Sequence, residues 1–246
     1  MLFLVLIFFG MHSYAKDFKD ETLNYVISYK WGLIHKDAGE ATLKLRNSGN
    51  KYKLTLTGKT KSWADNFYSV RDTLLGTVAK EGFKPLSYSK IAHEDGKYRR
   101  DDIQYIYARS TVGGKAHRTK IDKDGKMTQS EKTLTASGDV YDMLSVFYFL
   151  RTIDYSKLTS GHVVKASVFS GSKVESLTIR SVGKETIKPR NKEKREAYHI
   201  KFKFTTEGKK KSSEDIDAWI SIDSNHIPLQ LVGHLPVGQV KCYYIP

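Results

Sequence analysis

Apolar and polar residues alternate along most of the chain, a two-residue period that is typical of β-strands with one buried face. The clearest apolar rows are Tyr25, Ile27, Tyr29 and Trp31; Tyr52, Leu54 and Leu56; Ile103, Tyr105 and Tyr107; Ile200, Phe202 and Phe204; and Ile216, Ala218, Ile220 and Ile222. Turn sequences rich in Asn, Asp and Gly separate such rows at residues 47–50, 94–97 and 122–125. The pattern predicts about a dozen strands, a number at which a sheet curls into a barrel or splits in two.

One segment departs from this alternation. Residues 139–151 carry apolar side chains on nearly every side of a helix, which predicts a buried helix. Asp139 is the predicted N-cap, and Asp142 lies near the positive end of the helix dipole. A second, shorter helix is predicted over residues 62–70. The expected fold is therefore mainly β, a strongly curved antiparallel sheet or open barrel wrapped around one buried helix.

The N-terminus carries an apolar run over residues 2–10, followed by the small residues Ser13 and Ala15. This spacing predicts a signal peptide over residues 1–15, although no Lys or Arg precedes the run. The run is too short to span a bilayer as a helix. We therefore expect an exported protein, in the periplasm or on the periplasmic face of the outer membrane, with residues 16–246 forming a single β-rich domain.

The chain is basic, with 41 Lys and Arg against 27 Asp and Glu and a net charge of +14. In an exported protein this charge favours anionic lipid head groups or polysaccharide over nucleic acid as partners. Many lysines alternate with apolar residues along predicted strands, as in residues 201–204, which is typical of a solvated sheet face. Cys242 is the only cysteine, so no internal disulfide is expected.

Signatures of catalysis and metal binding are incomplete. Lys53 stands where a phosphate-binding loop ending at residues 58–60 needs its first glycine, and Lys97 stands where a zinc-protease motif starting at His93 needs its second histidine. The remaining histidines lack metal-ligand spacing. These departures predict no catalytic residue, no metal and no cofactor, and hence a protein that is not an enzyme.

A series of short motifs runs through nearly the whole of residues 16–246: Gly-Glu-Ala-Thr at 39–42, Gly-Lys-Thr at 58–60, Trp-Ala-Asp-Asn-Phe-Tyr at 63–68, Tyr-Asp-Met-Leu-Ser-Val-Phe-Tyr-Phe-Leu-Arg at 141–151 and Trp-Ile-Ser-Ile-Asp at 219–223. In order and spacing they resemble the bacterial family catalogued as domain of unknown function 3108. The resemblance implies an exported envelope protein. It implies no activity, so no site residue is carried over from it.

Two functions remain open. The first is a non-enzymatic binding or carrier protein for an apolar or lipid-like ligand, held between the concave sheet face and the aromatic helix. Trp63, Tyr141, Phe147 and Tyr148 would line that site, and Arg151 would pair with an anionic head group. The second is a structural or protein-interaction module with a fully packed interior, acting through an edge strand or basic loops. A cavity beside the helix favours the first function, and a packed interior favours the second.

Overall fold

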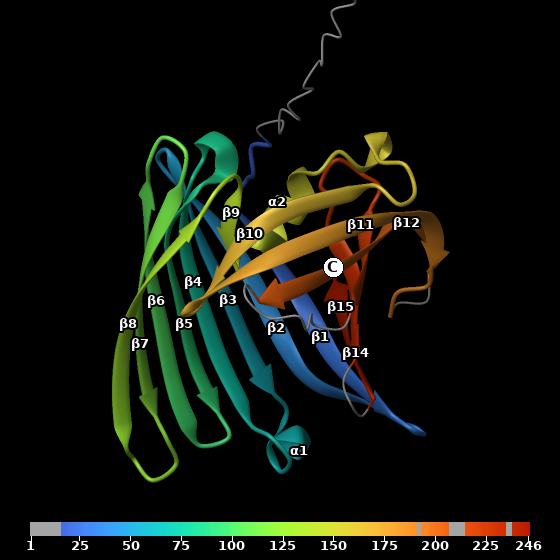
Figure 1. The fold of residues 1–246 in the computed structure, drawn as a ribbon. Helices are drawn as coiled ribbons and strands as arrows, with labels where there is room; N and C mark the ends of the chain where they lie inside the picture. Colours follow the sequence, from blue (N-terminus) through green and yellow to red (C-terminus); the bar gives the residue numbers. More distant parts are fainter. Residues whose placement is uncertain (1–15, 191–192, 207–214, 235–237) are drawn as a thin grey trace, which may run out of the picture.

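The computed structural model describes residues 16–190, 193–206, 215–234 and 238–246. The predicted signal peptide, residues 1–15, lies outside these residues. Within them, fifteen strands form one continuous, strongly curved sheet (Figure 1). The sheet runs in the order β8-β7-β6-β5-β4-β3-β2-β1-β15-β14-β13-β12-β11-β10-β9, so β8 and β9 are its two edges.

The first eight strands form an antiparallel meander, coloured blue to green in Figure 1. Their bounds are β1 (Glu21–Trp31), β2 (Ile34–Ser48), β3 (Lys51–Thr60), β4 (Val70–Ala79), β5 (Pro85–Glu94), β6 (Lys97–Tyr107), β7 (Val112–Ile121) and β8 (Met127–Ala136). The predicted turns are present. Gly49, Gly96 and Gly125 take positive φ angles of 62°, 75° and 79° in them, a conformation that glycine adopts without steric cost.

The remaining strands are β9 (Val140–Asp142), β10 (Val163–Ser170), β11 (Lys173–Ile187), β12 (Arg195–Thr206), β13 (Ile216–Ser221), β14 (Pro228–His234) and β15 (Gln239–Ile245). β15 pairs with β1 and joins the two parts of the sheet. β9 pairs with β10 in parallel, so the sheet is mixed and not purely antiparallel. The prediction of about a dozen strands was too low because β8 is largely polar and exposed, while all three residues of β9 are buried. Neither strand shows the alternation of a half-buried strand.

The structure also corrects the predicted helices. The buried helix α2 spans Ser145–Thr152, and the residues before it form β9. Asp142, not Asp139, organises the turn into the helix: its Oδ1 accepts backbone N–H bonds from Leu144 (2.9 Å) and Ser145 (2.7 Å). The predicted helix over residues 62–70 is a single turn, α1 (Ser62–Asp65). Two 3-10 turns, η1 (Glu81–Phe83) and η2 (Tyr155–Lys157), complete the elements. No helix in the described ranges is long and apolar enough to cross a membrane.

The core lies on two sides of α2. Leu144, just before the helix, and Tyr148 pack with the inward rows of the first strands, such as Leu45 and Leu54. Val146, Phe149 and Leu150 pack with β10 to β13. The helix therefore fills the space between the two parts of the curved sheet.

The two ends of the meander differ. Because its strands are antiparallel, the β1–β2, β3–β4, β5–β6 and β7–β8 connections share one end of the sheet, at the bottom of Figure 1 with α1. We call this the lower end. The opposite, upper end carries η1 and α2, whose Phe83 and Tyr148 rings lie 5.7 Å apart. The upper end is thus closed by packed rings.

Candidate functional site

The aromatic residues predicted to line a site at α2 are packed against other rings. Tyr148 is fully buried, and its ring lies 5.4 Å from that of Phe18. Tyr141 stacks on Phe149 at 4.4 Å. Phe147 contacts Tyr25 edge-on at 6.5 Å. Tyr141 and Tyr148 are buried in the core, and Phe147 is partly buried against it.

Arg151 is also buried in the core, where its side chain is hydrogen-bonded to other parts of the protein. It is 1% exposed, its Nη1 and Nη2 both bond to the carboxylate of Glu21, and its Nε donates to the carbonyl of Asn225 (3.1 Å). Its guanidinium carbon lies 4.9 Å from the ring centroid of Phe18. Lys16 donates to the carbonyl of Arg151 (3.1 Å), and burial and the Arg151 charge lower the pKa of Lys16 to about 8. Arg151 therefore ties α2 to β1 and to the chain around Asn225.

Trp63 is not brought together with the other predicted residues. It lies in α1 at the lower end, where its Nε1 donates to the carbonyl of Asp37 (2.7 Å). The ammonium group of Lys36 lies 4.6 Å from its ring centroid. The predicted site is thus divided between two ends of the molecule.

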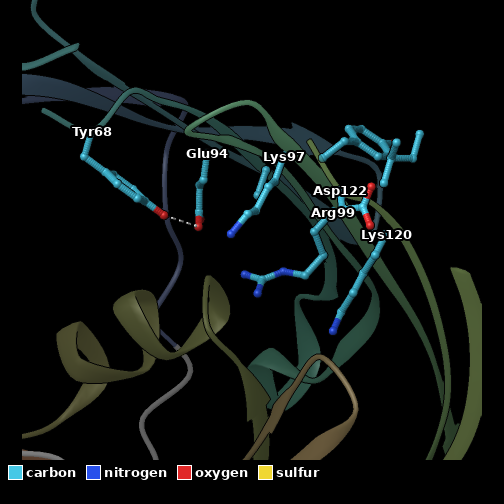
Figure 2. Close-up of a pocket in the computed structure, with 9 residues that line it drawn as sticks. Tyr68, Glu94, Lys97, Arg99, Lys120 and Asp122 are labelled. Atoms are coloured by element: carbon cyan, nitrogen blue, oxygen red, sulfur yellow. Dashed lines mark hydrogen bonds between the residues drawn. The ribbon is translucent and has the colours of Figure 1, made fainter. Parts of the chain in front are cut away.

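An open hollow of about 220 Å³ lies at the lower end, on the concave side of the meander (Figure 2). Its position follows from the strand register, which sets Ala92, Arg99 and Lys120 side by side on β5, β6 and β7. The loop after β3 supplies one further wall. The lining residues are Tyr68, Ala92, Glu94, Lys97, Tyr98, Arg99, Lys120, Ile121 and Asp122.

Three cations dominate this hollow. Figure 2 shows the nitrogen-bearing ends of Lys97, Arg99 and Lys120 extending to the same side. In the part of the chain that the structure describes, neither lysine has a carboxylate within 4.0 Å. Arg99 lies 3.4 Å from Asp101, but Asp101 also bonds to Arg118. That 3.4 Å contact is made by the buried Nε of Arg99 and is an ion pair without a hydrogen bond. The positive charge of the hollow is therefore not fully compensated.

A ladder of charged side chains continues from the hollow along the concave face. Tyr68 donates to Glu94 (3.3 Å), and Lys90 lies 3.1 Å from both Glu94 and Asp72. Burial raises the pKa of Asp72, against the effect of Lys90. Burial also acts to raise the pKa of Glu94, but the hydrogen bond and charge of Lys90 outweigh it and lower that pKa. Lys90 thus pairs with both Asp72 and Glu94, and these contacts hold the wall of the hollow in place.

The alternation along β6 is the sequence signal for this site. Lys97, Arg99 and Asp101 continue the same alternating row as Ile103 and Tyr105, so they had to point to the same face of β6. Charged residues in register with a buried row indicate a polar region within a concave face. No group of three or more His, Cys, Asp or Glu suited to a metal ion occurs in the described ranges.

Comparisons with known proteins agree with this fold. A family model described as "Protein of unknown function (DUF3108)" matches residues 24–244. The chain is also similar to a solved structure titled a beta-barrel-like protein of domain of unknown function DUF1849 from Brucella abortus. That similarity has a TM-score of 0.62 at 10% identity, covering 92% of this chain and 96% of that chain. At this identity it shows the fold alone. A comparison with curated proteins finds no significant match.

Proposed function

The chain belongs to the DUF3108 family, and we propose that it is an exported, non-enzymatic binding protein of the cell envelope whose ligand carries an anionic group on an apolar body. The observation that supports this most directly is the hollow in which Lys97, Arg99 and Lys120 converge without full compensation. An anionic group placed there forms charge-assisted hydrogen bonds with cations that otherwise face water. The basic net charge of the chain attracts such ligands over a longer distance.

The size of the hollow limits the part of the ligand that it holds. At about 220 Å³ it is smaller than the pockets of about 300–1,000 Å³ that enclose drug-sized ligands. The upper end is filled by Phe18, Tyr148 and their neighbours. The proposed ligand is therefore a phosphate- or carboxylate-bearing lipid whose head group enters the hollow while its apolar chains stay outside.

Calorimetric titration with short-chain phosphatidylglycerol below its micelle concentration tests the proposal. Titration with inorganic phosphate shows whether a free anion binds as well as the lipid does. Titration with short-chain phosphatidylcholine, which has no net charge, shows whether binding depends on the charge of the head group and not on its size. Lys97→Ala combined with Lys120→Ala removes two charge-assisted bonds and is expected to weaken phosphatidylglycerol binding by about 10- to 100-fold. Lys53→Ala, an exposed lysine on β3, is the matched control. Unchanged affinity in the double variant refutes the proposal.

A protein-interaction module is the second candidate, and the edge strand β8 is the observation that favours it. Residues 127–133 of β8 are exposed, and β8 pairs only with β7 among the described strands. An unpaired strand edge accepts an added strand from a partner. A photocrosslinking residue at Gln129 tests this in cells. A specific protein adduct supports the module, and the absence of any adduct counts against it.

A further inference from the structure

We infer that the lower end of the molecule docks on a bilayer surface rich in anionic lipids, with Leu33, Phe67 and Tyr68 entering the lipid interface. All three are exposed side chains in connections at that end, with relative exposures of 105%, 80% and 50%. A single exposed apolar residue is ordinary on a protein surface. Here three lie in two connections at the same end of the molecule, Leu33 in the β1–β2 turn and Phe67 and Tyr68 together after α1, where their exposure to water is unfavourable.

The loop that carries Phe67 and Tyr68 is anchored to its neighbours. Trp63 in α1 bonds to the carbonyl of Asp37 on β2, and its ring lies 6.2 Å from that of Phe67. The amide of Asp95 in the β5–β6 turn donates to the carbonyl of Ser69 (2.8 Å), which follows Tyr68. Phe67 and Tyr68 are therefore held against β2 and the β5–β6 turn, and they need little ordering on contact with a surface.

The charge at this end is suited to anionic lipid. Asp37, Asp65 and Asp95 are each ion-paired, whereas Asp122 and Asp124 of the β7–β8 turn are exposed and have no cation within 4.0 Å in the described residues. The exposed Lys30 and Lys36, which flank Leu33 in sequence, have no carboxylate within 4.0 Å in the described part of the chain. The ammonium group of Lys36 lies over the Trp63 ring, and tryptophan and lysine side chains are both typical of the membrane–water interface.

The hollow favours a bilayer over an apolar protein surface as the partner that contacts the lower end. Tyr68 is both an exposed tip and a lining residue of the hollow, so a surface that contacts Tyr68 also faces Lys97 and Lys120. The hollow has room for a head group and not for a whole lipid. A bilayer offers apolar depth to the tips and anionic head groups to the cations at the same time. The argument from the hollow rests on the proposed function. The argument from the exposed apolar side chains does not.

Vesicle flotation of the protein purified after export tests the inference, with its N-terminus determined by mass spectrometry. We expect binding to vesicles of phosphatidylethanolamine and phosphatidylglycerol, weakening as salt is added, and little binding to phosphatidylcholine vesicles. Leu33→Asp combined with Phe67→Asp is expected to weaken vesicle binding about tenfold or more. Ile106→Asp, at an exposed apolar residue at the other end of β6, is the matched control.

Brominated lipids give a second readout that does not depend on a variant that folds. They quench tryptophan at the interface, so we expect the emission of the wild type, which carries Trp31 at the end of β1 and Trp63 in α1, to fall on brominated anionic vesicles. Vesicle binding that is unchanged in the Leu33 and Phe67 double variant overturns the inference, as does self-association of the wild type that this variant abolishes. Binding of monomeric phosphatidylglycerol without vesicle binding overturns the docking surface and leaves the proposed function standing. Vesicle binding without binding of monomeric phosphatidylglycerol supports the docking surface and overturns the proposal that the hollow binds a head group.

Discussion

The ion pair between Arg151 and Glu21 joins α2 to β1, and replacing Glu21 by Gln separates a structural role of Arg151 from a ligand-binding one. Arg151 is 1% exposed, and the Glu21 side chain is 22% exposed. Removing one partner of a fully buried ion pair costs about 3–5 kcal/mol. Because water screens part of the Glu21 charge, we expect Glu21→Gln to lower the free energy of unfolding by about 2–3 kcal/mol.

Urea denaturation measures this loss directly, and thermal unfolding is expected to shift down by about 4–12 °C for a chain of this size. Glu40→Gln is the matched control because Glu40 pairs with Lys59 at 2.9 Å in an exposed position. Breaking that surface pair is expected to cost less than about 1 kcal/mol. Equal stability of the two variants refutes the reasoning. If Arg151 instead serves the ligand, Glu21→Gln frees its charge and strengthens phosphatidylglycerol binding, whereas we expect no change in affinity.

Three further predictions concern buried groups and backbone strain. Burial raises the pKa of Asp142 from 3.8 to about 6, with the N–H bonds of Ser145 and Leu144 opposing it, so its contribution to stability is complete below pH 3.8 and is lost as pH rises through about 6. Comparing urea unfolding of the wild type with Asp142→Asn across this range should show that difference, and a flat difference contradicts it. Tyr148→Phe removes a buried hydroxyl that has no hydrogen-bond partner, so its free energy of unfolding should stay within about 0.5 kcal/mol or rise. Gly171→Ala should lower the free energy of unfolding by about 1–3 kcal/mol, because Gly171 has a φ of 59° and a Cβ there overlaps the guanidinium of Arg118. Gly125→Ala, with a φ of 79° and open space around the Cβ, isolates the backbone part of that loss.

The closed upper end and the open lower end differ in what a substitution there is expected to change. Residues around α2, including Tyr148 and Leu144, are fully buried and stabilise the fold. The hairpins at the lower end hold Lys97, Arg99 and Lys120 around an open hollow. A mutation near α2 is therefore expected to change stability, while a mutation in the hollow is expected to change binding.

Local sequence patterns were enough to predict most of the strands and their turns. A two-residue period places every second side chain on one face, so the burial of Tyr25, Leu54 and Ile103 followed directly from the pattern. The glycines of the hairpin turns were equally local signals, because positive φ angles need no tertiary contact to favour glycine.

Features that depend on what covers each segment could not be predicted from local patterns and became visible in the folded structure. A dense apolar run is shared by a buried helix and by a strand covered on both sides, so the division of residues 139–151 into β9 and α2 depended on the pairing of β9 with β10. The partner of Arg151 is Glu21, 130 positions away, and sequence spacing carries no information on such a contact. The hollow likewise requires three strands in register. Alternation fixes the face on which Lys97 and Arg99 lie, but only the curvature of the sheet and the filling of its upper end by α2 leave that part of the face open.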